Sequence, residues 1–584
     1  MEKRILLAVL LMTAVILLTN VLFPPPPRPE RAVRGEADTA AAGGATLPVA
    51  APLPAPPVPE PEPGGVADTV TVSTPLYRYS FSTRGAKLVG AELLEHASFV
   101  NDGAAANLVP AGGSMLGYRL VLGADTVDLD GSLFRADAAN LRLDAGQDPR
   151  TVTFRYTGES GFGVTLAYTF YPDRYLVGVR GRVSGVEGQG AVLLTGFGGG
   201  LAPNETDLDR WAGELAVVAR QDRSVETLRF RALEQSRRVE GPLRWAGIKD
   251  RYFLAGMVAE SVPFAGLTAA RLAPESFDRQ SAPRARTSVA VPLAEGGRFG
   301  YRVYLGPMEY GRMAAAGSDL EQANPFGYRW LQPILRPIAA AILWVLALLH
   351  DNLGIAYGWV LIIFGVMMRV VTWPLHAKAM RAQLRNMAVQ PLMQEIREKY
   401  QDDPQRQQQE MVRLYKEEGF NPLAGCLPML IPMPILITLF FVFERTIEFR
   451  GVPFLWMPDL SLKDPLFILP VFLMASMFAL QIISQKLSGM EMNPQMKMMM
   501  YVMPALFGFI FFFLPAGLNL YYATSNVATL PQQVLIARER KKAQEKMKAE
   551  RARAEPEAKP GKQRPLAPAG ENRAARRRAG RKTG

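Results

Sequence analysis

The sequence of 584 residues is poor in the side chains that most enzymes need, with one cysteine and three histidines. Cys426 alone builds no disulfide framework, and the histidines lie too far apart in the sequence to predict a metal or catalytic centre. Residues 423–426 mimic a lipoprotein cleavage box. Such a box ends an N-terminal signal, so we interpret Cys426 as a buried thiol at the start of a helix.

Sequence motifs for common catalytic sites are also absent. The sequence has no G-x-x-x-x-G-K-[ST] phosphate loop, no H-E-x-x-H zinc motif and no G-x-S-x-G nucleophile turn. These absences argue against a membrane-anchored enzyme, and no cofactor is predicted.

Basic charge is concentrated at the C-terminal end of the chain. The net charge is +12, and residues 538–584 hold 17 Lys and Arg against 6 Asp and Glu. Such a run is typical of a disordered tail that contacts anionic partners. We expect a basic cytoplasmic tail over 538–584.

The N-terminal segment predicts a membrane anchor followed by a spacer. Residues 5–23 are uncharged and mostly apolar behind Lys3 and Arg4. The run is longer than a typical signal core and lacks a small-x-small cleavage site, so an uncleaved anchor over 1–23 is favoured over a signal peptide. Its N-terminus is expected inside. Residues 24–67 are rich in Pro and Ala and predict an extended linker.

A period of two dominates residues 68–310. Apolar and polar residues alternate in short runs separated by turn signals such as Pro172-Asp173. This pattern predicts antiparallel hairpins and a large β-sandwich. The runs are Leu76–Ser82, Lys87–Leu94, Tyr118–Leu122, Thr151–Tyr156, Gly163–Tyr171, Tyr175–Val183 and Tyr301–Leu305. The sandwich follows an anchor whose N-terminus is inside, so it is expected outside the cytoplasm.

Residues 325–350 predict a helix that lies along the outer membrane interface. Arg336-Pro337 interrupts the apolar pattern, and the uninterrupted run Ile338–Leu349 is too short to cross a bilayer. Trp330 and Trp344 suit interfacial depth.

Residues 352–537 predict a core of five membrane helices, which gives six with the anchor. The uncharged stretches are Asn352–Met368, Gly419–Phe443, Pro465–Gln485 and Met498–Ala537, the last long enough for two crossings joined at Pro515-Ala516-Gly517. Loops rich in Lys and Arg alternate with loops that lack such an excess, which predicts both termini in the cytoplasm.

The cytoplasmic segment 376–420 predicts a helical hairpin. Pro391 can open one helix, and Asp402-Asp403-Pro404 is a stop and a restart, with Asp403 as N-cap. A self-packed solvated hairpin and a docking arm remain alternatives, because its charges are nearly balanced.

Several motifs in 355–540 resemble one family. They are Arg369-x-x-x-Trp373-Pro374-Leu375, Asn421-Pro422-Leu423-x-Gly425-Cys426-x-Pro428 and Pro515-x-Gly517-Leu518-x-Leu520-Tyr521-Tyr522. Together with the order of parts, they resemble the YidC membrane-protein insertases of Gram-negative bacteria. In the β-domain the likeness is looser, with Trp245-Ala246-Gly247 and Asp250-Arg251-Tyr252-Phe253 as the best matches. Pro432 departs from the family, in which a polar residue is common.

The resemblance implies an ATP-independent insertase and chaperone for nascent membrane proteins, acting alone or beside the Sec translocon. It implies a hydrophilic groove open to the cytoplasm and to membrane lipids and closed on the outside. A substrate helix would slide into lipid along the spans near 423–443 and 498–514, or along the last span. The ribosome is a further expected partner, through the tail and the hairpin.

Arg369 is the leading candidate site residue, because a charge inside a membrane helix is costly and usually functional. Snorkelling to the interface near Trp373 is the alternative. Polar residues in other spans are candidates for the groove or for helix–helix hydrogen bonds. The candidate groove residues are Arg369, Gln481, Gln485, Asn519, Tyr521, Tyr522 and Asn526. A transporter or channel is the rival class, but the helices show no internal repeat.

Overall fold

The computed structural model describes residues 67–532, Leu535 and Glu545. Within 67–532 it leaves gaps at 102, 124, 159–161, 187–189, 223, 234, 274–283, 328–329, 418–432 and 489–493. The predicted anchor and linker lie outside the described residues, as do Cys426, Pro432 and almost all of the basic tail.

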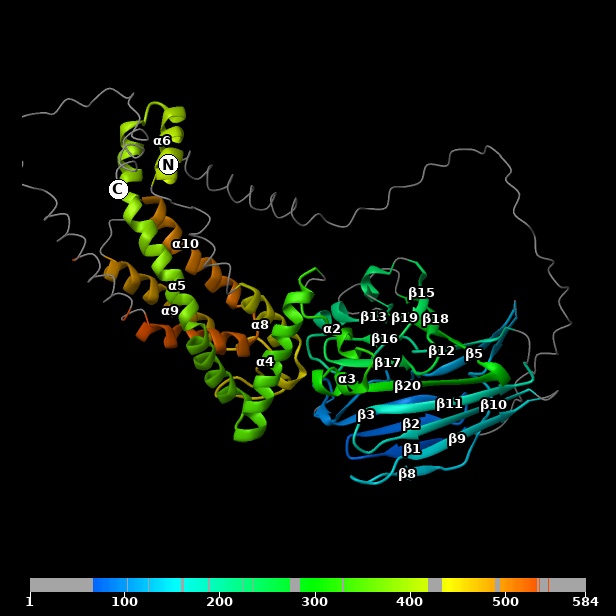
Figure 1. The fold of residues 1–584 in the computed structure, drawn as a ribbon. Helices are drawn as coiled ribbons and strands as arrows, with labels where there is room; N and C mark the ends of the chain where they lie inside the picture. The colour runs from blue at the N-terminus through cyan, green and yellow to red at the C-terminus, as the bar shows by residue number, and fades with distance from the viewer. Residues whose placement is uncertain are drawn as a thin grey trace, which may run out of the picture. The chain divides into compact units, whose positions relative to one another are not determined.

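Three β-sheets form the first described part of the chain (Figure 1). The five-stranded sheet runs β4 (Ala105–Asn107), β3 (Lys87–Ala97), β2 (Tyr77–Ser82), β1 (Thr69–Ser73) and β8 (Asn140–Arg142). The six-stranded sheet runs β15 (Arg237–Leu243), β18 (Phe264–Ala273), β19 (Arg284–Pro292), β12 (Val192–Gly196), β5 (Gly117–Leu122) and β6 (Asp125–Asp128).

The third sheet has nine strands and is the largest. Its order is β14 (Val225–Arg229), β13 (Ala216–Arg220), β16 (Trp245–Lys249), β17 (Phe253–Ala259), β20 (Arg298–Pro307), β11 (Leu176–Ser184), β10 (Gly163–Phe170), β9 (Arg150–Thr157) and β7 (Arg135–Ala136). All of its pairs are antiparallel. The predicted β-sheet domain and its hairpins are therefore confirmed.

Alternation in the sequence explains why one face of each strand is buried. In β10, Val164, Leu166, Tyr168 and Phe170 are buried and the residues between them are partly exposed. Successive side chains of a strand point to opposite faces, so a period of two places every apolar residue of β10 on one face. The same period predicted the run Gly163–Tyr171, which matches the observed strand Gly163–Phe170 within one residue.

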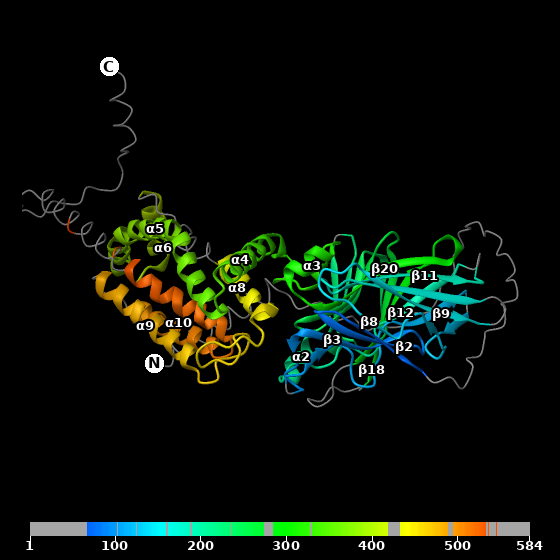
Figure 2. The same ribbon diagram turned by 90° about the horizontal axis from the view of Figure 1, so that it is seen from below.

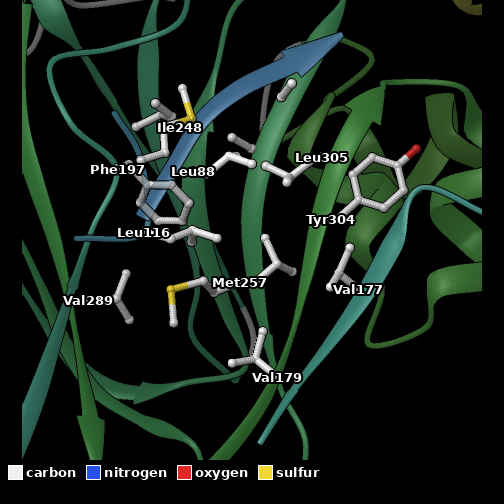
Figure 3. Packing of buried hydrophobic residues seen from close by; sticks show 14 of the residues in the cluster. Leu88, Leu116, Val177, Val179, Phe197, Ile248, Met257, Val289, Tyr304 and Leu305 are labelled. Atoms are coloured by element: carbon white, nitrogen blue, oxygen red, sulfur yellow. The ribbon is translucent and has the colours of Figure 1, made fainter. Parts of the chain in front are cut away.

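The core lies between the three sheets. Figure 3 shows buried side chains that meet there from different sheets, among them Leu88 of β3, Val179 of β11 and Val289 of β19. The Tyr118 hydroxyl lies 2.6 Å from that of Tyr168 and 3.0 Å from that of Tyr301. Buried hydroxyls need partners, so this trio joins β5 of one sheet to β10 and β20 of another.

Helices form the second described part of the chain (Figures 1 and 2). They are α4 (Gln332–Leu353), α5 (Tyr357–Lys399), α6 (Pro404–Glu417), α8 (Met433–Arg445), α9 (Ile468–Ser488), α10 (Pro494–Phe511) and a last helix over 516–532. Helices α9 and α10 run side by side in both views, and α4 packs on α8. Short helices α2 (Leu208–Glu214) and α3 (Tyr310–Ala316) accompany the sheets.

Helix α4 is longer than the sequence predicts. It is continuous over 22 residues and includes Pro337, so the expected break at Arg336-Pro337 is wrong. A proline in the second turn of a helix removes a single backbone hydrogen bond. The buried stripe Leu335, Ala339, Ile342 and Leu346 compensates by packing on the core. Among the described helices, α4 and Tyr357–Pro374 are long and apolar enough to cross a membrane.

The expectation that Pro391 opens a helix is also wrong. Pro391 lies inside α5, which runs unbroken for 43 residues. The restart after it is confirmed, because α6 begins at Pro404 and the Asp403 carboxylate accepts the Arg406 N–H at 3.0 Å. This is the N-cap geometry that the sequence predicts. Gly419, the expected end of the hairpin, lies outside the described residues.

Two regions of the helical part, the 446–464 connection and the start of the last helix, are hydrogen-bonded to each other. The backbone N–H groups of Ala516 and Gly517 donate to the carbonyls of Leu462 and Leu460 at 2.7 and 2.8 Å. The buried Asp464 carboxylate accepts the Leu469 N–H at 2.7 Å and so caps the start of α9. The tight turn predicted at 515–517 lies slightly earlier, at 512–515, because the last helix already begins at residue 516. The start of this helix is fixed to the 446–464 connection.

Candidate substrate groove

Arg369 lies on the buried face of α5. Leu361 and Gly365, eight and four residues earlier, are buried, and this spacing places all three residues on one stripe of the helix. Val370 and Val371 are about two-thirds exposed and lie on the opposite side. The Arg369 side chain is only partly exposed, so it points toward the bundle and not toward the outer surface.

A glycine brings α5 close to the last helix. A Cβ placed on Gly365 would lie 3.2 Å from the Thr524 Cγ2 and 3.4 Å from the Tyr521 carbonyl oxygen. These distances are at the limit of side-chain packing, so the two helices approach as closely as this position allows. Arg369 follows one turn later on the same face and is therefore held beside the last helix.

Tyr521 is the predicted groove residue that the structure brings to Arg369. Its phenol ring is buried and lies within electrostatic range of the guanidinium. The ring packs against Phe364 of α5, with centroids 5.8 Å apart, and Phe443 of α8, at 6.1 Å. Tyr522 packs instead on Phe511 of α10, at 5.0 Å. The two neighbouring tyrosines thus contact different helices.

The predicted amide residues are not gathered around Arg369. Asn519 is buried and donates to the Phe511 carbonyl of α10 at 3.1 Å. Asn526 donates to the Ser476 hydroxyl of α9 at 3.0 Å, a helix–helix hydrogen bond that the sequence left as an alternative. Gln481 is exposed on α9, and the side chain of Gln485 lies outside the described residues.

Two polar residues of the bundle were not predicted. Gln532 is buried near the end of the last helix, and neither end of its amide has a hydrogen-bond partner among the described residues. Thr438 of α8 is buried and donates to the Pro434 carbonyl at 2.7 Å. A signal for Gln532 existed, since it is an uncharged polar residue in the same apolar stretch as Asn526.

An apolar cavity of about 740 Å³ opens between α5, α9 and the last helix. Its lining includes Val366, Phe472, Leu520, Ala523 and Val527. Arg369 and the amide residues are not part of this lining. The apolar cavity and the face of α5 that carries Arg369 are therefore separate features of the bundle.

A turn of the β-domain supports the C-terminal end of α8. The buried Asp250 carboxylate accepts the N–H groups of Tyr252 and Phe253 at 2.8 and 2.7 Å and so fixes the turn. This turn presents Arg251, whose Nε and Nη2 donate to the Glu444 carbonyl at 2.8 and 2.6 Å. A cation is favourable at the carbonyl end of a helix. The role of the motif Asp250–Phe253 is thereby explained.

Arg450 makes a second connection between the two described parts. Its Nε lies 2.6 Å from Glu205 Oε1, and its two terminal nitrogens donate to the carbonyls of Ala97 and Asn204 at 2.8 and 3.0 Å. The guanidinium also stacks over Phe99 at 4.2 Å. Burial raises the pKa of the Glu205 carboxyl to about 7, although Arg450 acts in the opposite direction.

Known families cover most of the described chain. Residues 69–341 match the family described as the YidC periplasmic domain, and residues 348–545 match the family described as the 60Kd inner membrane protein. A membrane protein insertase YidC of Chlorobaculum parvum is 30% identical over 562 residues, which is 88% of this chain and 90% of that protein. The chain belongs to the YidC membrane protein insertase family.

A second relative by sequence agrees with this assignment. The insertase YidC of Syntrophus aciditrophicus is 29% identical and covers 92% of this chain and 99% of its own length. The solved structure of an active YidC insertase with the first transmembrane domain resolved is 18% identical and covers 82% of this chain and 94% of its own. Its TM-score of 0.32 is too low to carry an argument about the fold.

Membership of the YidC family settles the class of activity. The protein is a membrane protein insertase and not an enzyme, and its substrates are nascent membrane proteins. It is an inner-membrane protein whose β-sheet domain is periplasmic. The helical part that carries Arg369 is the insertase core.

Proposed function

We propose that this YidC insertase receives the polar segment of a substrate on the face of the core that carries Arg369 and Tyr521. The observation that carries the proposal is a guanidinium directed into the bundle from a helix that is otherwise uncharged between Tyr357 and Pro374. A positive charge in a medium of lowered dielectric attracts an acidic segment more strongly than it does in water. Gln481, Gln485, Asn519, Tyr522 and Asn526 are proposed as further groove positions.

The substrate's apolar helix leaves this face for lipid along α8, α10 or the last helix. The apolar cavity between α5, α9 and the last helix supports the exit along the last helix, because almost all of its lining residues are apolar. The joined connections at Leu460 and Gly517 support closure on the outer side. The segment therefore enters from the cytoplasm in this proposal.

The proposed topology has both termini in the cytoplasm and the predicted anchor over 1–23 as the first crossing. Lys378, Arg381 and Arg385 on the extension of α5 support it, because such an excess of Lys and Arg favours the cytoplasmic side. The Sec translocon is the proposed partner for larger substrates. The ribosome is the proposed partner of the tail over 538–584 and of the hairpin.

Reconstitution tests the proposed function. Vesicles that contain this chain as their only protein should insert a small single-span test protein without ATP, measured by protection of its translocated segment from added protease. Insertion should stop when α5 carries Arg369→Ala and the translocated segment is acidic. If the vesicles instead take up small solutes without inserting the test protein, a transporter is the better description.

A further inference from the structure

Edge strands of the β-domain are protected, with one exception. The end strands β4, β7 and β8 have two or three residues, and β6 carries Asp125 and Asp128. Strand β15 contains Pro242 and an irregular register. Shortness, charge, proline and bulges are the usual means of blocking an exposed sheet edge. Strand β14 also carries two charged residues, Glu226 and Arg229, but it has five residues, no glycine or proline, and an unbroken register with β13.

The free edge of β14 has a defined set of backbone groups. The Gln221 N–H donates to the Ser224 carbonyl, and the Phe230 N–H donates to the Leu215 carbonyl. In an antiparallel pair the bonded residues alternate along each strand. Ala219 pairs with Glu226, and Val217 pairs with Leu228. The backbone N–H and C=O groups of the even-numbered residues of β14 therefore point toward β13. The N–H and C=O groups of Val225, Thr227 and Arg229 point the other way, where the described residues include no further strand.

A polar cavity of about 980 Å³ lies against this strand. Ser224, Val225, Glu226 and Thr227 line it on one side, and residues at the start of α4 line it on the other, including Gln332 and Arg336. The cavity thus joins the free edge of the sheet to the first turn of the helix that leads into the core.

A buried donor faces the same cavity. Arg220 of β13 lines it and is 91% buried, with a relative exposure of 9%. Its terminal nitrogens bond Asp319, at 3.2 Å, and Gln322, but its Nε has no hydrogen-bond partner among the described residues. A buried donor without a partner is costly, and a carbonyl oxygen of a peptide is an acceptor that would satisfy it.

We propose that the β14 edge and its cavity bind the translocated segment of a substrate as an added β-strand. Strand addition uses the alternating backbone groups of an open edge and tolerates varied side chains, as an insertase with many substrates requires. The Arg220 Nε–H donates to a carbonyl oxygen of the same segment. This inference rests on the proposed function, because it assigns a receiving site to the segment that the core releases.

The test compares two substitutions at one position. Thr227→Pro removes an outward N–H and blocks strand addition, but it spares the bonds to β13, because proline is tolerated where the N–H of an edge strand faces solvent. Thr227→Ala is the matched control and keeps the backbone edge. A photoreactive residue at Glu226 reports contact with the translocated segment of a single-span test protein arrested during insertion into vesicles. Thermal melting verifies that both variants fold.

We expect adducts in the unchanged chain and in Thr227→Ala, and about a five- to tenfold loss in Thr227→Pro, as the removal of one or two hydrogen bonds predicts. Equal adducts in both variants, or adducts only between two copies of this chain, would overturn the inference. Protease protection in the same samples separates the two claims. Normal insertion without adducts refutes only the edge site, whereas no insertion by the unchanged chain refutes the proposed function.

Hydrogen exchange gives a second readout that does not depend on insertion. A synthetic peptide with the sequence of the translocated segment is added to the full chain in detergent. The amides of Val225 and Thr227 should exchange more slowly with the peptide, and those of Glu226 and Leu228, already bonded to β13, should not change. Unchanged exchange at Val225 and Thr227 would contradict strand addition.

Discussion

Arg251 shows how one side chain joins the two described parts of the insertase. Its guanidinium extends from a turn of the periplasmic domain and donates to the Glu444 carbonyl near the end of α8, 193 residues further along the chain. Burial lowers the pKa of this guanidinium, yet it keeps two bonds to one carbonyl oxygen. Charged hydrogen bonds of this kind are among the stronger ones in proteins.

Loss of this connection should be measurable. We expect Arg251→Ala to destabilise the full chain by about 1–3 kcal/mol, because the partly buried Glu444 carbonyl is left without its donor. Arg231→Ala is the matched control, since Arg231 forms an exposed ion pair with Asp209 and exposed pairs contribute little. Thermal melting in detergent provides the comparison. Equal losses in the two variants would show that Arg251 is not a structural connection.

His96 should make the periplasmic domain sensitive to acid. Burial and the neighbouring Arg450 and Arg312 lower the pKa of this imidazole to about 4. The folded state then favours the neutral ring, so its stabilising effect is complete above pH 6.5 and is lost as the pH falls toward 4. At pH 4.5 the loss is about 2 kcal/mol. We expect His96→Gln to lose less stability than the unchanged chain between pH 7 and 4.5.

Melting curves at the two pH values measure the difference. Glu205 titrates in an overlapping range with the opposite sign, because its raised pKa favours the protonated acid in the folded state. Its contribution is present in both proteins and cancels in the comparison. The same acid sensitivity in His96→Gln and the unchanged chain would contradict the assignment.

For single residues, the sequence identified a candidate by its charge but did not predict which residues contact each other. Arg369 was evident because its charge interrupts an apolar stretch. Arg251 was noticed only within a motif, and nothing in the sequence connects it to Glu444. The partners of Asn519 and Asn526 were also beyond reach, because they depend on which helices are neighbours.

Elements were predicted well where a short period or a terminal signal defines them. The alternation in β10 and the capping residue Asp403 fixed their elements closely. Prolines misled the prediction twice, at Pro337 and Pro391, because each lies inside a helix. A proline costs a helix one bond and some strain, and packing or helix length outweighed that cost here.

Close contact between α5 and the last helix predicts a test at Gly365. We expect Gly365→Val to reduce insertion and to destabilise the core by about 1–3 kcal/mol, because the added methyl groups overlap Thr524 and the Tyr521 carbonyl. Gly311→Val is the control, since its Cβ would have no neighbour within 4 Å. Protease protection of an inserted test protein and thermal melting report the two effects. Equal behaviour of both variants would show that the helix contact does not position Arg369.

The basic segment at residues 538–584 carries almost all of the net positive charge of the whole molecule. The balance of 17 basic and 6 acidic residues over 538–584 can attract ribosomal RNA or anionic lipid. We expect deletion of 541–584 to weaken co-sedimentation with ribosomes at low salt, and added salt to reduce the difference. Unchanged co-sedimentation, with weaker binding to vesicles of anionic lipid, would favour the membrane surface as the partner.

The order of parts was the most predictable property of the molecule. Composition alone separated a β-domain from apolar helices, and family comparison assigned the β-domain to the periplasm and the helices to the insertase core. The linker and the basic tail stay predictions, because the linker and almost all of the tail lie outside the described residues. The path of a substrate through the core was not predictable from composition. In the proposed function it depends on how closely α5 approaches the last helix, which places Arg369 beside Tyr521.

The central claim is that the charge of Arg369 draws in acidic substrate segments, and the most direct measurement is the insertion rate of two matched test proteins. They differ only in whether the translocated segment is acidic or neutral, and each is inserted into vesicles that hold this chain alone. We predict that Arg369→Lys inserts both, because a point charge suffices, and that Arg369→Ala fails with the acidic segment but inserts the neutral one. Normal insertion of the acidic segment by Arg369→Ala would contradict the account and leave Arg369 as an anchor at the membrane interface.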